Sequence, residues 1–91
     1  LNTIAAYAVY VSGETMMPRL NPGEIVFVHP GKPCRANDSV VVQLKTDTAV
    51  IKTFQKFNET EIILSQFTTD ETVKFQRDEI KSVHKIIGIF I

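Results

Sequence analysis

The sequence has few of the cysteines that form disulfides in small proteins and none of the long apolar runs that anchor proteins in membranes. Its 91 residues contain one cysteine, Cys34, so no intramolecular disulfide can form. Such usage is typical of a reducing compartment, and we expect a cytoplasmic location. There is no run of about 18 apolar residues that could span a bilayer. The first ten residues also lack the basic region and cleavage pattern of a signal peptide, so we expect no membrane partner.

The sequence also has no excess of charge of either sign. Ten basic and ten acidic side chains give a formal net charge of zero, whereas proteins that grip DNA phosphates need a cationic surplus. His29 and His84 have no cysteine or carboxylate at metal-ligand spacing, and no glycine-rich phosphate loop is present. We therefore expect these residues to bind no nucleic acid by themselves, no metal and no cofactor.

What the sequence does contain is a two-residue alternation rich in Val, Ile and Phe, which is typical of β-strands. Seven segments have it: residues 6–12, 24–29, 39–44, 49–55, 61–66, 72–76 and 82–91. The turn clusters at 45–48 and 56–60 are short enough to close antiparallel hairpins. Prolines limit the one helical segment, 16–21, to about a single turn. The predicted fold class is all-β, a small folded antiparallel sheet or partly open barrel of about seven short strands in one domain.

Two side chains stand out from this pattern, a hydroxyl and an amine. Thr15 lies between a glycine turn and an apolar Met-Met-Pro step, and Lys52 lies within an apolar strand, where alternation puts it on the face of Val50 and Phe54. A buried lysine has a lowered pKa, and a neutral amine can activate a hydroxyl as a nucleophile. Alternatively, Thr15 caps a turn and Lys52 extends its ammonium group to water. The residues alone leave both interpretations open.

The stretch VSGETMMPRLNPGEIVFV, residues 11–28, resembles the Val-x-Gly-x-Ser-Met-x-Pro box of the LexA and lambda-repressor self-cleaving peptidase family. The segments DSVVVQL and AVIKTF are similar to the family's Val-rich hairpin and lysine-bearing strand, and EIILSQF and IIGIFI look like its remaining strands. Lys52 follows Thr15 by 37 residues, the separation that this arrangement requires. The resemblance covers nearly the whole chain. It implies a LexA-C-terminal or signal-peptidase-like fold with one short helical turn after the nucleophile position.

The chain departs from the family at the nucleophile, because Thr15 stands where the family has serine; Glu24 likewise stands where aspartate is usual. The extra methyl of threonine restricts χ1 and crowds a site shaped around a primary alcohol. The resemblance implies Thr15 and Lys52 as the catalytic pair and the backbone N–H groups of Glu14 and Thr15 as oxyanion donors. Because of the methyl group, we expect self-cleavage to be weak or absent.

Partners are also implied by the resemblance. Relatives carry an N-terminal helix-turn-helix that binds DNA, and their C-terminal strands build a dimer. The chain starts without methionine and lacks the Ala-Gly or Cys-Gly dipeptide that the family cleaves. We therefore expect residues 1–91 to be the peptidase-like regulatory and dimerisation domain of a longer protein. It would form a homodimer through its C-terminal strands, reach DNA only through the missing domain, and respond to a recombinase filament or an antirepressor protein.

Three functions remain open at this point. The first is the dimerisation and regulatory domain of a phage-type transcriptional repressor, weakly active or inactive in self-cleavage. The second is an active self-cleaving peptidase that uses Thr15 and Lys52 in the SOS response to DNA damage. The third is a translesion-polymerase accessory subunit of the same fold, which would have a short N-terminal arm in place of the helix-turn-helix.

Overall fold

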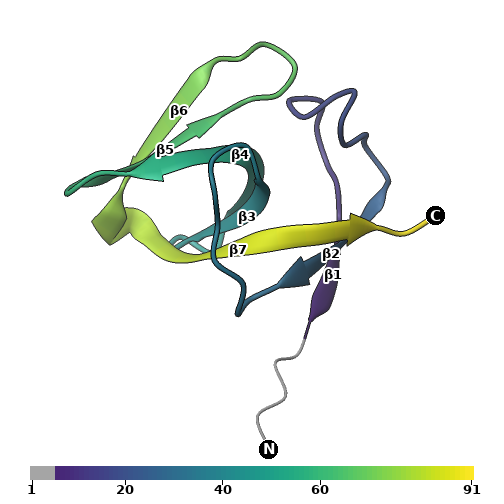
Figure 1. Cartoon of the computed structure of the whole chain (residues 1–91), viewed down its shortest axis with the longest axis horizontal. Helices are drawn as coiled ribbons and strands as arrows, with labels where there is room; N and C mark the ends of the chain where they lie inside the picture. The colour runs from purple at the N-terminus through teal and green to yellow at the C-terminus, as the bar shows by residue number, and fades with distance from the viewer. Residues whose placement is uncertain (1–5) are drawn as a thin grey trace, which may run out of the picture.

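The alternating segments form strands where the sequence predicts them. The computed structural model of the chain describes residues 6–91 (Figure 1). Its strands are β1 (Tyr7–Tyr10), β2 (Ile25–His29), β3 (Ser39–Leu44), β4 (Ala49–Phe57), β5 (Glu61–Ser65), β6 (Thr72–Gln76) and β7 (Ile80–Ile89). One short 3₁₀ helix, η1 (Arg77–Glu79), leads into β7 and was not predicted. The all-β fold class is confirmed.

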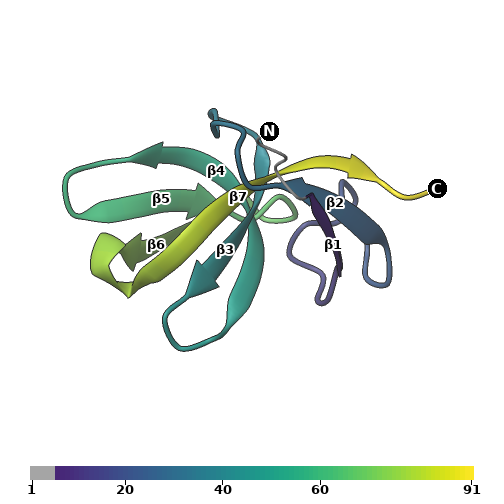
Figure 2. The same cartoon turned by 90° about the horizontal axis from the view of Figure 1, so that it is seen from below.

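All seven strands pair antiparallel in one open sheet with the order β1-β2-β7-β3-β4-β5-β6. Strands β3 to β6 follow one another as hairpins, which confirms the two predicted hairpin turns. Strand β7 lies between β2 and β3, pairing with β3 along its first half and with β2 along its second. It therefore joins the β1–β2 end of the molecule to the β4–β6 end, as Figures 1 and 2 show.

The apolar side chains form two clusters because successive residues of a strand point to opposite faces of the sheet. The loop-side cluster comprises Val11, Met16, Leu20, Val26, Val28 and Val41. The hairpin-side cluster comprises Val40, Val42, Phe54, Ile62 and Leu64. Strand β3 contributes to both clusters, which explains why its sequence is an unbroken apolar run and not an alternation.

The predicted helical turn is a single hydrogen-bonded turn. Leu20 N–H donates to the Met16 carbonyl oxygen at 2.9 Å, and the chain does not continue into a helix. Among residues 6–91, no helix has the length and apolar character needed to cross a membrane. The turn occupies the connection between β1 and β2, which also carries Thr15.

Candidate active site

The connection between β1 and β2 is held at its base by backbone hydrogen bonds. Val11 N–H donates to the Glu24 carbonyl oxygen and Gly23 N–H donates to the Val11 carbonyl oxygen, each at 2.8 Å. Gly13 and Gly23 have φ values of +79° and +87°, a left-handed conformation that glycine adopts without steric cost. The loop therefore leaves the sheet and returns to it at fixed points.

The turn itself is anchored in the core on both sides of its centre. Met16 and Leu20 are each 2% exposed and belong to the loop-side cluster. Glu24 ends the turn: its Oε1 accepts hydrogen bonds from the backbone N–H and the side-chain amide of Asn21. With its neighbour Met16 buried, Thr15 is held next to the core and remains half-buried.

Thr68, in the connection between β5 and β6, holds the same turn from outside. Its N–H donates to the Thr15 carbonyl oxygen at 3.0 Å. Its Oγ1 lies 2.7 Å from the carbonyl oxygens of Glu14 and Met17, and its single hydroxyl proton can be donated to either one. Sequence reasoning missed this residue, because TTDE indicates only a turn and the contacts span more than 50 residues of chain.

Lys52 reaches Thr15 from β4. It pairs with Val40 of β3, whereas the pairing of β4 with β5 extends only as far as Thr53 with Ser65. Lys52 Nζ donates a hydrogen bond to Thr15 Oγ1 at 2.9 Å. The two side chains singled out in the sequence are thus in direct contact.

Burial shifts the protonation equilibrium of this amine toward its neutral form. Desolvation by burial lowers the pKa of Lys52 below the ordinary lysine value. The ion pair found among residues 6–91 joins Lys85 to Asp38, at 3.4 Å, and no carboxylate in that range pairs with Lys52. A larger fraction of the Lys52 amine is therefore unprotonated near neutral pH than for an exposed lysine. An unprotonated amine can accept the Thr15 hydroxyl proton.

A pocket of about 290 Å³ adjoins the pair. Its wall is made by β1, by the start of the turn and by the β3–β4 hairpin, with the lining residues Val9, Tyr10, Ser12, Gly13, Thr15, Val41, Ala49, Val50, Ile51 and Lys52. The wall has both apolar and polar parts, and the hydroxyl and the amine belong to the polar part. A small group bound there would lie beside both.

The predicted oxyanion donors lie at the start of the same turn. Within residues 6–91, neither Glu14 N–H nor Thr15 N–H donates to a protein acceptor. Thr15 also lines the pocket, whereas Glu14 does not. No group of three or more His, Cys, Asp or Glu side chains that could hold a metal ion occurs among the residues described.

The sequence profile of the Peptidase S24-like family matches residues 2–91. The chain is also 39% identical over 94 residues to the Repressor protein C of Rhizobium phage 16-3, an alignment that covers 94% of this chain and 36% of that protein. The chain thus spans about a third of the length of this relative. The resemblance to the LexA and lambda-repressor type of C-terminal domain is confirmed, and the chain belongs to the Peptidase S24-like family.

Proposed function

We propose that residues 1–91 are the regulatory and dimerisation domain of a phage-type transcriptional repressor whose self-cleavage site is weakly active or inactive. The similarity to a phage repressor protein supports the repressor role. The 2.9 Å contact between Thr15 Oγ1 and Lys52 Nζ, beside a small pocket, carries the proposal of a cleavage site. DNA is contacted by a separate domain, and a recombinase filament or an antirepressor protein regulates the site.

The reaction that this pair would support is hydrolysis of a peptide bond. Neutral Lys52 takes the proton of Thr15 Oγ1 while the oxygen attacks the scissile carbonyl carbon. The resulting oxyanion accepts hydrogen bonds from Glu14 N–H and Thr15 N–H. Lys52 returns the proton to the leaving nitrogen as the C–N bond breaks, and water then hydrolyses the ester at Thr15 with Lys52 again as the base.

Threonine at the nucleophile position is the reason for proposing slow cleavage. Its methyl group lies on the same carbon as the attacking oxygen and limits the χ1 angles that the side chain can adopt. Displacement of a reacting atom by about 1 Å costs roughly a hundredfold in rate. Serine at position 15 keeps the hydroxyl and removes this constraint.

Incubation of the full-length protein at alkaline pH tests the assignment of the pair. We expect slow or no cleavage in the wild type and cleavage about a hundredfold faster in Thr15→Ser, from relief of the geometric penalty. Adding Lys52→Ala to Thr15→Ser should abolish cleavage, because the base is lost. Cleavage is followed by gel electrophoresis and the cut is placed by mass spectrometry.

Two results would contradict parts of this proposal. Cleavage of Thr15→Ser that persists with Lys52→Ala would rule out Lys52 as the base. Wild-type cleavage as fast as that of Thr15→Ser would replace the weak site by an active threonine peptidase, which the 2.9 Å contact and the lowered pKa of Lys52 also support.

The proposed homodimer rests on exposed apolar side chains at the β2–β7 end. Phe27, Ile87, Ile89 and Phe90 are between 38% and 62% exposed. The rings of Phe27 and Phe90 meet edge to face with centroids 6.2 Å apart. Apolar groups gathered in this way at one end of a sheet are suited to burial against a second copy.

Light scattering during chromatography measures the oligomeric state directly. We expect a dimer in the wild type and a monomer for Ile87→Lys, which places a charge among the exposed side chains of Phe27, Ile89 and Phe90. Phe57→Lys, at a similarly exposed apolar position (44%, against 46% for Ile87) on β4 at the other end of the sheet, is the control and should stay dimeric. A wild-type protein that is strictly monomeric at high micromolar concentration would exclude the dimer.

A further inference from the structure

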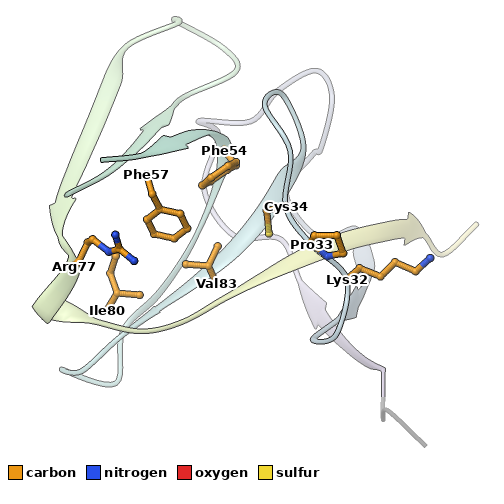
Figure 3. A pocket seen from close by; sticks show the side chains of 8 residues that line it. All are labelled: Lys32, Pro33, Cys34, Phe54, Phe57, Arg77, Ile80 and Val83. Atoms are coloured by element: carbon orange, nitrogen blue, oxygen red, sulfur yellow. The ribbon is translucent and has the colours of Figure 1, made fainter. Parts of the chain in front are cut away.

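A second and larger pocket lies on the hairpin side of the sheet. Its volume is about 420 Å³, and it shares no lining residue with the pocket beside Thr15. Strand β4, η1, the start of β7 and the connection between β2 and β3 surround it (Figure 3). Its uncharged lining residues are Pro33, Cys34, Phe54, Phe57, Ile80 and Val83.

The apolar wall of this pocket is part of the packed core. Phe54 is 6% exposed and belongs to the hairpin-side cluster, against which Ile80 and Val83 also pack. The rings of Phe54 and Phe57 lie 5.4 Å apart and are tilted by 58°. Phe54, Ile80 and Val83 are held by the core, so this part of the wall is formed without a ligand, and Phe57, 44% exposed, extends it outward. The volume of the pocket lies within the ordinary range for small-molecule sites, about 300–1,000 Å³.

Among residues 6–91, the charged residues that line the pocket are Lys32 and Arg77, and both are cations. The Arg77 guanidinium lies 4.8 Å above the ring of Phe57, and its Nη1 donates to the Asn58 carbonyl oxygen at 3.1 Å. Within residues 6–91, Arg77 pairs with no carboxylate. Figure 3 shows the Arg77 guanidinium at one end of the pocket. The Lys32 ammonium points away from the pocket.

The middle of the pocket carries no opposing negative charge. The Cys34 side chain points inward in Figure 3, and burial raises the pKa of its thiol, with a smaller contribution from Asp38. The thiol is therefore neutral near pH 7. The charge of Asp38 is balanced by its ion pair with Lys85. A ligand would thus meet an apolar, partly aromatic wall with a single cation at one end.

We propose that this pocket binds a small amphipathic carboxylate. The apolar body of the ligand packs against Phe54, Phe57 and Val83, and its carboxylate accepts hydrogen bonds from the Arg77 guanidinium. A planar guanidinium presents parallel N–H groups that match the two oxygens of a carboxylate. The guanidinium is already stacked on Phe57, so binding orders few additional groups.

Three probes with one apolar body and different charges test the proposal: phenylbutyrate, phenylbutanol and phenylbutylamine. Binding to the full chain is followed by NMR through the methyl signals of Ile80 and Val83. We expect the carboxylate to bind about fivefold more tightly than the alcohol. This factor corresponds to the upper end of the free energies that exposed ion pairs contribute. The amine should bind more weakly than the alcohol.

A matched pair of variants separates the charge from the apolar wall. Arg77→Met keeps an unbranched side chain over Phe57 but removes the charge. It should therefore lower the affinity for phenylbutyrate about fivefold and leave the affinity for phenylbutanol unchanged. Arg19→Met is the control, because Arg19 also lies over a phenylalanine ring, 5.7 Å from that of Phe67, but does not line the pocket. It should change neither affinity.

Three results would overturn the proposal. They are equal affinity for the carboxylate and the alcohol, an unchanged carboxylate affinity in Arg77→Met, and probe binding that leaves the Ile80 and Val83 signals unmoved. None of these measurements depends on cleavage at Thr15. Failure of this proposal and failure of the proposed cleavage site are therefore distinguishable.

Discussion

The two sides of the sheet are built differently. The hairpin-side cluster takes all its residues from β3, β4 and β5, which follow one another as hairpins. The loop-side cluster takes Val11, Met16 and Leu20 from the irregular connection between β1 and β2. Regular strand pairing therefore holds one side, whereas the other depends on how one loop is packed and hydrogen-bonded.

Thr15 lies on the side that depends on the loop, and Lys52 reaches it from β4. A hydroxyl on a regular strand would be fixed by ladder pairing, whereas Thr15 is held by buried Met16 and by contacts with Thr68. Lys52 comes from a regular strand and needs no such support. The pair thus joins a rigid base to a nucleophile whose position is set by a few specific contacts. The comparison predicts that the two sides respond differently to similar substitutions.

The largest effect is expected from truncating one leucine in each cluster. Leu64→Ala empties a fully buried position between paired strands and should lower the free energy of unfolding by about 4 kcal/mol. Leu20→Ala removes the same atoms from the loop, which can move inward to fill the space, and should cost about 2.5 kcal/mol. Urea unfolding of both variants measures the difference. Equal losses of unfolding free energy would show that the two clusters do not differ in how they respond to truncation of a leucine.

A smaller effect is expected from removing one hydroxyl that holds the turn. Thr68→Val keeps the side-chain shape but removes the hydrogen bond to the Glu14 or Met17 carbonyl oxygen, at a cost of about 1 kcal/mol. In the Thr15→Ser background we expect cleavage to slow by at most about fivefold, the factor for a barrier raised by the full ~1 kcal/mol, because the lost bond holds the turn that positions residue 15.

Thr69→Val is the matched control for this prediction. The Thr69 hydroxyl contacts only its own loop, at Gln66 and Glu71, so this change should leave the cleavage rate as it was. A Thr68→Ser variant, which restores the hydroxyl, should recover the rate. If Thr68→Val and Thr69→Val slow cleavage equally, Thr68 has no special role in placing Thr15.

The strands were predictable from sequence because alternation is a local signal, and all seven predicted segments form strands. The place of β7 between β2 and β3 was not predictable from the pattern, since strand order depends on contacts between distant residues. The 3₁₀ helix Arg77–Glu79 was missed because three residues are too few to show a helical period.

The site was predictable to the extent that a motif marks it. Thr15 and Lys52 were identified through the family box and the lysine-bearing strand, and the structure brings them within 2.9 Å of one another. Thr68 and Arg77 carry no such mark. Thr68 belongs to an ordinary turn sequence and Arg77 to a charged run, and only the fold brings them to the Thr15 turn and to the second pocket.

The smallest expected effect is a dependence of stability on pH that originates at Lys52. The folded-state pKa of Lys52 is lowered from the ordinary value of 10.5 by burial, so the folded chain binds this proton less tightly than the unfolded chain does. Between the two pKa values the unfolded state holds more protons. The free energy of unfolding contributed by this residue therefore rises as the pH approaches 10.5.

Lys52→Met removes this contribution and keeps an unbranched side chain of similar length. Other titrating groups act on the wild type and the variant alike, so the difference between their urea midpoints isolates Lys52. We expect the urea midpoint of the variant to exceed that of the wild type by most near neutral pH. This difference between the two midpoints should decrease as the solution becomes alkaline. A difference that stays constant with pH would show that Lys52 is no less basic than an exposed lysine. Thr15 would then lack the neutral amine on which its proposed chemistry depends.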